Sequence, residues 1–397
     1  MNKEAEALMR RQVSDRELER RWRAVRQAMK ERGLDFLVMQ NAIAHLSGYV
    51  RWFTDVPIGG NPSTVIFPRE EEMTTIWHGG RPPAEPKPPA WAVRGVKKRL
   101  SVPIILALGY SSIYDAEQVV AELKPHGKCR VGLVGLGLMS AALYKYVTEH
   151  LSGVTFEDAT DMVDTIKAVK SEEELGFLRE TCRIEDEIFT DVLARVRPGR
   201  TDYELYRDIV AKSLEMGADQ TNILVGSAPA GTATRMSGPS FMVNRALEKG
   251  DHVHILIETN GPGGYWGELG RVISLGKPAA ELQEHFELDV KAREVTLDLL
   301  KPGNDPAAIF AANNAFLRKA GYPEERRIYA HGQGYDMVER PSLDPGETMK
   351  LAARMFISVH PTVMSPKAFV SLTDDYFMGD NGKLECLHRT PVKIFEV

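Results

Sequence analysis

Hydrophobic positions in the first 160 residues switch repeatedly between helical and strand spacing. Residues 15–33 predict an amphipathic helix, because apolar side chains recur three or four positions apart among charged ones, at Leu18, Trp22, Val25 and Met29. Short apolar runs predict strands at 35–39, 64–67, 74–77 and 130–134. A further helix is predicted from Ser140. Alternating strands and helices indicate a small α/β domain.

The remainder of the chain begins with a helix-start signal. Ser171, with Glu174 three residues later, has the pattern of a capping box and predicts a long helix through Phe189. We place the domain boundary just before this helix, which gives domains 1–165 and 166–397. Two later segments, 196–199 and 299–303, each carry Pro-Gly between two predicted helices. This repeat indicates that the second domain has two similar halves.

Composition and charge limit the classes of function. With 43% hydrophobic and 26% charged residues, the 397-residue chain has an ordinary globular composition and is long enough for two domains. A formal net charge of −5 argues against a nucleic-acid partner. Cys129, Cys182 and Cys386 are widely spaced, which favours a reducing compartment over a disulfide framework. Without a leader-like or membrane-spanning run, we expect a cytoplasmic protein with no membrane partner.

Three motifs in the last 70 residues carry a resemblance to a known family. They are Tyr329-Ala330-His331-Gly332-Gln333-Gly334-Tyr335, Val338-Glu339-Arg340-Pro341 and Met355-Phe356-Ile357-Ser358-Val359-His360-Pro361. In this order they resemble the GHGIG, HExP and EP motifs of the creatinase/prolidase family. The segment 166–174 is similar to the IKSxxE junction of the same family. The resemblance implies a creatinase-like α/β N-terminal domain, followed by an α+β catalytic domain with the pita-bread fold.

The resemblance also assigns a set of functional positions. In the metallopeptidase members, two Asp, one His and two Glu bind two metal ions. The matching positions of this chain hold Leu256 or Glu258, then Glu268, His331, His360 and Thr373. The first position stays open, because counting from the Gly-Asp turn at 250–251 gives Leu256 while strand alternation also turns Glu258 to the same face.

The altered set changes the metal chemistry that the resemblance implies. A dinuclear centre needs carboxylates shared between two ions, and Thr373 cannot replace a bridging glutamate. We therefore expect no metal cofactor. The alternative is one divalent ion on Glu268, His331 and His360, a set of two histidines and one carboxylate. A dinucleotide is not expected either, because the glycines at 132, 135 and 137 have the wrong spacing for the fingerprint.

A metal-free site would depend on acid–base chemistry. We predict that His331 and His360 are the proton shuttles, because imidazole titrates near neutral pH, and that Glu268 orients one of them or activates water. The three side chains should meet on the floor of one cavity. Creatinase moves protons with a His at a position that is Pro239 here, so its own mechanism does not carry over. Predicted substrate-binding residues are Glu258, Tyr265, Arg271, Arg340 and His254, together with Arg51 and Trp52 from the first domain.

A segment of the first domain is predicted to act across a dimer. In creatinase-like relatives a loop of this domain reaches the partner's active site, and the matching segment is 41–57, which contains His45, Arg51, Trp52 and Phe53. Arginine and tryptophan suit a planar or carboxylate-bearing small molecule. The alternative is that Trp52 and Phe53 only cover a domain interface. The resemblance implies a homodimer, the commonest symmetric assembly.

The combination of a retained frame and changed site residues favours a small-molecule hydrolase or lyase. It would cleave a C–N bond of the amide or amidine type, or a neighbouring bond, by general acid–base catalysis. Two alternatives stay open. One is a metal-dependent Xaa-Pro aminopeptidase or prolidase with a modified mononuclear site, and the other is a pseudoenzyme that binds a ligand through the same fold.

Overall fold

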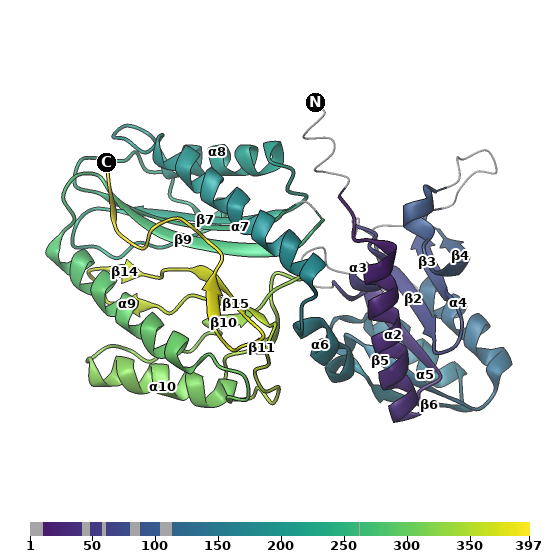
Figure 1. The fold of residues 1–397 in the computed structure, drawn as a ribbon. Coiled ribbons are helices and arrows are strands. Elements are labelled where there is room, and N and C mark those ends of the chain that lie inside the picture. The colour runs from purple at the N-terminus through teal and green to yellow at the C-terminus, as the bar shows by residue number, and fades with distance from the viewer. Residues whose placement is uncertain (1–10, 42–47, 58–60, 80–87, 104–112, 262) are drawn as a thin grey trace. The chain divides into compact units, whose positions relative to one another are not determined.

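A computed structural model describes residues 11–41, 48–57, 61–79, 88–103, 113–261 and 263–397 (Figure 1). The chain forms two compact units, Gln12–Lys167 and Ala168–Val397, and Arg11 belongs to the second of them. Each unit contains a hydrophobic core of its own. None of the helices in the described ranges is both long enough and apolar enough to cross a membrane.

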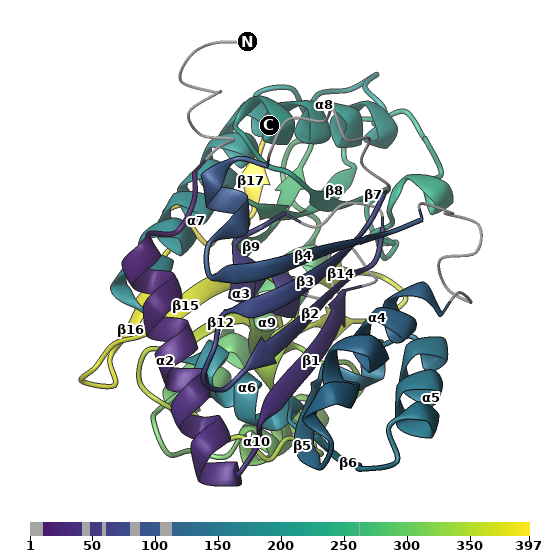
Figure 2. The same ribbon diagram turned by 90° about the vertical axis from the view of Figure 1, so that its right-hand side faces the viewer.

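The first unit is a mixed six-stranded sheet flanked by helices (Figure 2). Its strand order is β4 (Val96–Val102), β3 (Met73–His78), β2 (Ser63–Pro68), β1 (Phe36–Asn41), β5 (Cys129–Val134) and β6 (Val154–Asp158). Its helices are α2 (Asp15–Arg32), α3 (Tyr49–Thr54), α4 (Tyr114–Leu123), α5 (Ala141–His150) and α6 (Thr160–Ala168). Val38 and Ile66 pack with residues of α4 and α5. Phe67, which alternates with Ile66, packs against Phe53 of α3 on the opposite face.

The predicted elements of this unit are present, and their ends follow from capping. The Ser14 side chain accepts a hydrogen bond from the Glu17 amide at the start of α2, and Gly33 ends the helix with a φ of 69°. Only glycine adopts this left-handed conformation without strain, which explains why the helix stops there. The predicted strands at 35–39, 64–67, 74–77 and 130–134 correspond to β1, β2, β3 and β5.

The segment predicted as a reaching loop is different in the structure. Residues 49–54 form helix α3, and Arg51, Trp52 and Phe53 are all buried. The Trp52 ring lies under the Arg21 guanidinium, 5.3 Å from its centre, and the Phe53 ring packs edge-on against Phe67. Arg51 and Trp52, the two residues of this segment predicted to bind substrate, are thus buried within their own unit and do not present a surface to a ligand. His45 lies outside the described residues.

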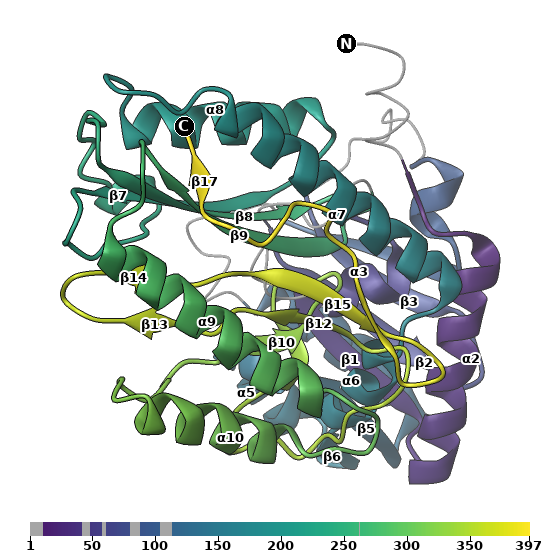
Figure 3. The same cartoon turned by 60° about the vertical axis from the view of Figure 1, so that its left-hand side comes forward.

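The second unit has two similar halves, and in each half two helices pack on a sheet (Figure 3). In the first half, α7 (Glu172–Leu193) and α8 (Asp202–Glu215) pack on a four-stranded sheet. Its order is β17 (Phe395–Glu396), β9 (Trp266–Ser274), β8 (His252–Asn260) and β7 (Thr221–Ala228). The capping box predicted at Ser171 and Glu174 is confirmed at the start of α7.

The second half of this unit repeats the plan with α9 (Ala280–Leu299) and α10 (Pro306–Lys319). They pack with a five-stranded sheet in the order β11 (Glu339–Ser342), β10 (Ala330–Gly332), β12 (Phe356–Val359), β15 (Asp374–Met378) and β16 (Leu384–Cys386). A short hairpin of β13 (Val363–Met364) and β14 (Phe369–Val370) lies beside α9. The predicted helix–Pro-Gly–helix units are thus α7–α8 and α9–α10.

The two sheets meet at a close backbone contact between Gly270 of β9 and Thr373, just before β15. The Gly270 amide donates to the Thr373 carbonyl at 3.1 Å, and the Thr373 amide donates back at 3.3 Å. A Cβ atom on residue 270 would lie only 2.5 Å from the Thr373 hydroxyl oxygen. Glycine is required here so that the two sheets can approach, and the approach brings the two halves together at one site.

Candidate active site

The pairing of β8 with β9 places two acidic side chains opposite each other. Glu258 pairs directly with Glu268 across these antiparallel strands, and Leu256 pairs with Gly270. Cross-strand partners in this arrangement have neighbouring side chains on the same face. The sequence leaves two candidates, Leu256 and Glu258, for the first functional position. The strand pairing favours Glu258, because it is the acidic side chain opposite Glu268. Leu256 lies on the same face and lines the same cavity.

The two predicted histidines converge on Glu268 from the other sheet. His331 lies on β10 and His360 directly follows β12, which pairs antiparallel with β10. His331 Nε2 is 3.6 Å from Glu268 Oε2, and His360 Nε2 is 4.0 Å from the same oxygen. The two imidazole rings are 5.1 Å apart at their centres and are inclined by 64°. The predicted meeting of these three side chains in one cavity is observed.

They line a cavity of about 250 Å³ in the second unit. Its wall is made of Leu224, Met236, Leu256, Glu258, Glu268, Arg327, Ile328, His331, Val338, His360, Ser371 and Thr373. The lining combines apolar side chains with two carboxyls and two imidazoles. This combination of an apolar wall with a few convergent polar groups is typical of a small-molecule site.

Burial changes the protonation of the two glutamates. It raises the pKa of Glu268 to about 7, although the Ser358 hydroxyl, which donates to its Oε2 at 3.0 Å, acts in the opposite direction. Burial raises the pKa of Glu258 well above its usual range, and the neighbouring negative charge of Glu268 adds to this. The pair therefore retains protons at neutral pH, and Glu268 is the group that titrates near pH 7.

Burial acts on the histidines in the opposite sense. It lowers the pKa of His331 to about 4, and it lowers the pKa of His360 well below its usual range, where the nearby His331 adds to the effect. Both rings are neutral at pH 7. The prediction that imidazole is the group titrating near neutrality is not supported by the surroundings of these rings, because their burial disfavours the charged form. That property belongs to Glu268 instead.

Hydrogen bonds define which ring nitrogen of His331 faces the cavity. His331 Nδ1 lies 3.0 Å from the Gly332 carbonyl oxygen, which can only accept, so the proton of the neutral ring is assigned to Nδ1. The Nε2 lone pair then faces Glu268. His360 Nε2 is buried and has no hydrogen-bond partner among the described residues. Both histidines thus present an unused nitrogen to the cavity.

Arg271 and Tyr265 do not line the cavity as predicted. Arg271 is three residues from Glu268 on β9, so its side chain points to the opposite face, where it is fully buried and bonds to Asp374. The Tyr265 ring stacks on Phe177, and its hydroxyl donates to Glu174 at 3.2 Å. Both side chains support the fold around the site and do not bind substrate.

His254 and Arg340 are also placed elsewhere. His254 is fully buried, with Nε2 2.9 Å from the Ser371 carbonyl oxygen, so it supports a cavity residue from behind. Burial lowers its pKa to about 4. Arg340, on β11, forms an ion pair with Glu347 and does not reach the cavity. The prediction of substrate contact is wrong for both residues.

The sequence did not single out three polar residues that shape this site. Arg327 contributes a positive charge at the cavity with a side chain that is 53% exposed. Ser358 holds Glu268 through its hydroxyl, and Asp375 accepts a hydrogen bond from the Glu268 amide at 2.9 Å. Ser358 on β12 lies two positions before His360, so the alternation of side chains along a strand indicates that Ser358 and His360 face the same side.

The donors present do not match a two-metal centre. Thr373 takes the place of a carboxylate, and its hydroxyl oxygen has no hydrogen-bond partner among the described residues. A neutral hydroxyl cannot bridge two ions as a carboxylate does. The ligand atoms of Glu268, His331 and His360 all lie within 4.8 Å of one another, so these three fit a single divalent ion.

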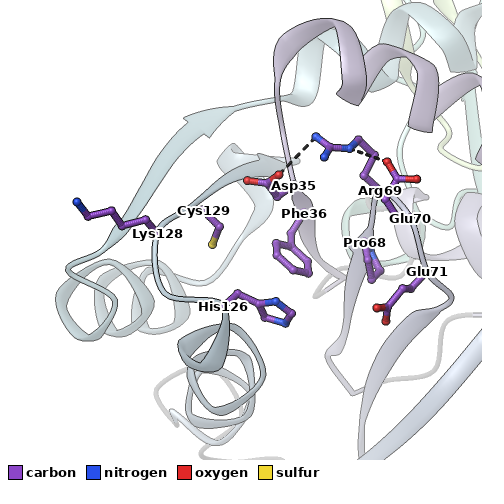
Figure 4. A pocket seen from close by; sticks show the side chains of 9 residues that line it. All are labelled: Asp35, Phe36, Pro68, Arg69, Glu70, Glu71, His126, Lys128 and Cys129. Atoms are coloured by element: carbon purple, nitrogen blue, oxygen red, sulfur yellow. Dashed lines mark hydrogen bonds and ion pairs between the residues drawn. The ribbon is translucent and has the colours of Figure 1, made fainter.

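The first unit has a hollow of its own, of about 320 Å³, shown in Figure 4. It is polar and open, and its Arg69 is paired with Asp35 and Glu70. Burial raises the pKa of the Cys129 thiol there, which disfavours the reactive thiolate. With its one arginine paired and its thiol unactivated, this hollow lacks the chemistry of the cavity at Glu268.

Comparison with known proteins was made for both sequence and structure. The sequence profile of metallopeptidase family M24 matches residues 176–380, more than half of the chain. An uncharacterized peptidase, YqhT, of Bacillus subtilis is 23% identical over 259 residues, which cover 63% of this chain and 70% of that protein. The probable dipeptidase PepE of Mycobacterium tuberculosis is 28% identical over 220 residues, covering 55% of this chain and 57% of its own length.

The likeness to solved structures extends over both units. The prolidase of Thermococcus sibiricus superposes with a TM-score of 0.75 at 18% identity, covering 96% of this chain and 99% of that one. The dipeptidase PepE of Mycobacterium ulcerans gives 0.75 at 21% identity, covering 98% and 100%. These similarities confirm the expected fold class, an α/β N-terminal domain with a pita-bread C-terminal domain.

Proposed function

This chain belongs to metallopeptidase family M24 and is a hydrolase of that family, and we propose that it hydrolyses a C–N bond of a small molecule without a two-metal centre. The observation that carries the proposal is the buried Glu258–Glu268 pair, with the pKa of Glu268 raised to about 7. A carboxyl group that titrates near the working pH is well suited to accept a proton and to return it. The cavity volume of about 250 Å³ favours a compact substrate over an extended peptide.

The geometry supports a division of roles among the cavity residues. Ionised Glu268 accepts a proton from a water molecule as the water attacks the amide or amidine carbon, and protonated Glu268 then returns this proton to the departing nitrogen. Glu258 keeps its proton at neutral pH and donates a hydrogen bond to the oxygen or nitrogen on which charge develops. His331 Nε2 accepts a hydrogen bond from the water or from a substrate N–H group.

The second candidate is a metal-dependent peptidase with one ion. It is favoured by the spacing of Glu268, His331 and His360 and by the names of relatives such as the Xaa-Pro dipeptidase of Pyrococcus furiosus. These three residues would hold the ion, which would supply Lewis-acid activation of a scissile carbonyl. The neutral state of both imidazoles is compatible with such ligation.

Metal dependence separates the two candidates. Protein dialysed against EDTA is expected to keep at least half of its kcat on amidino or N-acyl amino acids, and to show no turnover of Ala-Pro. The reason is that Glu268 and the neutral histidines supply the proton transfers themselves. Turnover of Ala-Pro that disappears with EDTA and returns with one equivalent of Mn²⁺, Co²⁺ or Zn²⁺ would establish the peptidase instead.

Arg327 is proposed to bind the carboxylate of the substrate at the cavity mouth. Its Nε and Nη2 bond to Glu325 and its Nη2 also bonds to Thr362, while Nη1 donates no hydrogen bond within the described ranges. Arg327→Gln is expected to raise KM about 10-fold with kcat nearly unchanged, since this contact is the same in ground and transition states. The matched control is Arg326→Gln, which removes an exposed neighbouring arginine. Equal KM values for the two variants would reject the assignment.

We also propose a homodimer, on the resemblance to creatinase-like relatives alone. Light scattering at micromolar concentration should give about twice the chain mass of 44.3 kDa. A mass of one chain would reject it.

A further inference from the structure

A second cluster of ligand-type side chains lies behind Glu268. It comprises Cys182 and Glu185 on α7, Asp375 on β15 and His388 in the segment after β16. One potential ligand atom from each of these four residues lies within 4.8 Å of the others. All four side chains are buried, and those of Glu185, Asp375 and His388 have no exposed area. The proposed reaction does not use any of them.

The side chains of this cluster already contact one another. His388 Nε2 lies 3.0 Å from Glu185 Oε2, and the Cys182 thiol donates to Asp375 Oδ2 at 3.6 Å. Asp375 Oδ1 has no hydrogen-bond partner among the described residues. Gly267 makes room for the group, because a Cβ atom there would lie 2.7 Å from Glu185 Oε2 and 3.1 Å from Asp375 Oδ2.

The charge of the cluster is not balanced by protein cations. No arginine or lysine in the described ranges forms an ion pair with Glu185 or Asp375. Two carboxyl groups, a thiol and an imidazole are thus enclosed with no arginine or lysine of the described residues paired to the two carboxyls. Buried charges in proteins are paired or coordinate a metal, so the cluster must either hold its protons or exchange them for a cation.

We propose that Cys182, Glu185, Asp375 and His388 form a structural Zn²⁺ site. Thiolate, imidazole and carboxylate are the donors that Zn²⁺ takes, and four protein ligands with no open position are characteristic of structural zinc. Tetrahedral zinc needs donor atoms about 3.3–3.8 Å apart, so the observed spread of up to 4.8 Å closes with small side-chain movements.

Ligation by His388 through Nε2 requires a change of tautomer and the loss of one hydrogen bond. Nδ1 now accepts a long hydrogen bond of 3.3 Å from the Asp375 amide, which assigns the proton to Nε2. On binding, the metal replaces the proton of Nε2 and Nδ1 carries one instead, so the bond from the Asp375 amide breaks and the ring must turn its Nδ1–H group away from that amide. Asp374 Oδ1 lies 3.7 Å from Nδ1 and can accept this hydrogen, in the carboxylate–histidine–zinc arrangement common in zinc sites. The thiol and any protonated carboxyl release their protons to solvent.

The ion would connect three parts of the unit and bear on the candidate active site. It would join α7 to β15 and the segment at 388, which follow Cys182 and Glu185 by 193 and 203 residues. Asp375 accepts the hydrogen bond from the Glu268 amide, so fixing Asp375 also fixes the strand that carries Glu268. The proposed ion is a different one from any ion held by Glu268, His331 and His360.

Cobalt substitution tests the proposal directly. The full chain, stripped of metal by prolonged dialysis against chelator, is titrated with Co²⁺ and then with Zn²⁺. We expect one equivalent of Co²⁺ to bind with an intense near-ultraviolet thiolate-to-cobalt absorption, and Zn²⁺ to displace it. His331→Gln, which removes a ligand of the other possible site, is expected to keep this absorption and to lower the bound metal by less than twofold.

Matched cysteine variants decide the outcome. Cys182→Ser should abolish the thiolate absorption and weaken metal binding at least 100-fold, whereas Cys386→Ser, at an exposed thiol, should change neither. Circular dichroism establishes that the variants are folded. If Cys182→Ser does not fold, His388→Gln gives the same test. A cobalt spectrum without thiolate absorption in the unmodified protein, or binding lost in His331→Gln and kept in Cys182→Ser, would overturn the proposal.

Discussion

Replacing Glu268 by Gln is expected to lower kcat/KM about 10³-fold, the order that proton transfer by a positioned side chain contributes. The amide retains the shape of the side chain and can still accept a hydrogen bond from Ser358, but it cannot take up a proton. The measurement is steady-state turnover of the substrate identified in the metal-dependence experiment. Glu248→Gln, at an exposed glutamate in the same unit, is the matched control and should be active.

The pH profile adds a second readout to the same variant. Ionised Glu268 is the base, and its pKa is about 7, so kcat/KM of the unmodified enzyme should rise with pH through about 7 and then level off. In Glu268→Gln the residual activity should lack this rise. A variant that keeps more than a tenth of the activity, or keeps the rise, would show that another group is the base.

Stability distinguishes a lost base from a damaged fold. The pKa of Glu268 is raised in the folded state from an ordinary value of 4.5, so between about pH 4.5 and 7 the folded state binds more protons than the unfolded state. The free energy of unfolding therefore falls as pH rises through this window, and glutamine removes the effect. Glu268→Gln should consequently be at least as stable as the unmodified protein at pH 8, although its kcat/KM is about 10³-fold lower.

Arg271→Met is expected to reduce the free energy of unfolding by about 3 kcal/mol, the lower end of the loss usual when one partner of a buried ion pair is removed, because Asp374 keeps a second partner in Arg293. The guanidinium is fully buried and donates to Asp374 Oδ1 at 2.6 Å. It also donates to the carbonyl oxygens of Gly270, Thr373, Thr390 and Pro391. Removing it breaks all of these bonds, although the Gly270 and Thr373 carbonyls keep the hydrogen bonds that they accept from each other's amides.

Urea denaturation measures this loss. The matched control is Arg183→Met on α7, where the arginine pairs with Glu180 and Glu187 at the surface and the expected change is within about 0.5 kcal/mol. At temperatures where Arg271→Met is folded, its KM should be unchanged, because the side chain does not reach the cavity. A raised KM with unaltered stability would instead support the predicted role of Arg271 in substrate binding.

Local signals in the sequence predicted the parts of the fold that depend on neighbouring residues. The amphipathic spacing of Leu18 to Met29, the glycine at 33 and the capping box at Ser171 each describe a local preference, and the corresponding helices are present. The helix at 49–54 within the predicted loop 41–57 has no such signal, because six residues form too short a pattern to show a periodic face.

The residues of the candidate site can be predicted from the sequence where a motif of the family identifies a single position. His331, His360 and Glu268 each follow from such a motif, and they converge. The prediction for Arg271 fails because side chains alternate between the two faces of a strand. Arg271 lies three positions after Glu268 and therefore on the opposite face, and a motif match alone does not show which face a residue is on. The protonation states were beyond sequence reasoning, since the pKa values of Glu268 and His331 depend on how completely two sheets exclude water around them.

The close contact between Gly270 and Thr373 limits which side chains position 373 can hold. The Thr373 hydroxyl oxygen occupies the space in which a Cβ atom on residue 270 would lie only 2.5 Å away. A glutamate at 373 would place a longer side chain beside this contact, and it would add a third acid to a cavity that already holds Glu258 and Glu268. A single Thr373→Glu substitution would therefore disturb the packing of the two sheets and the charge of the cavity at the same time.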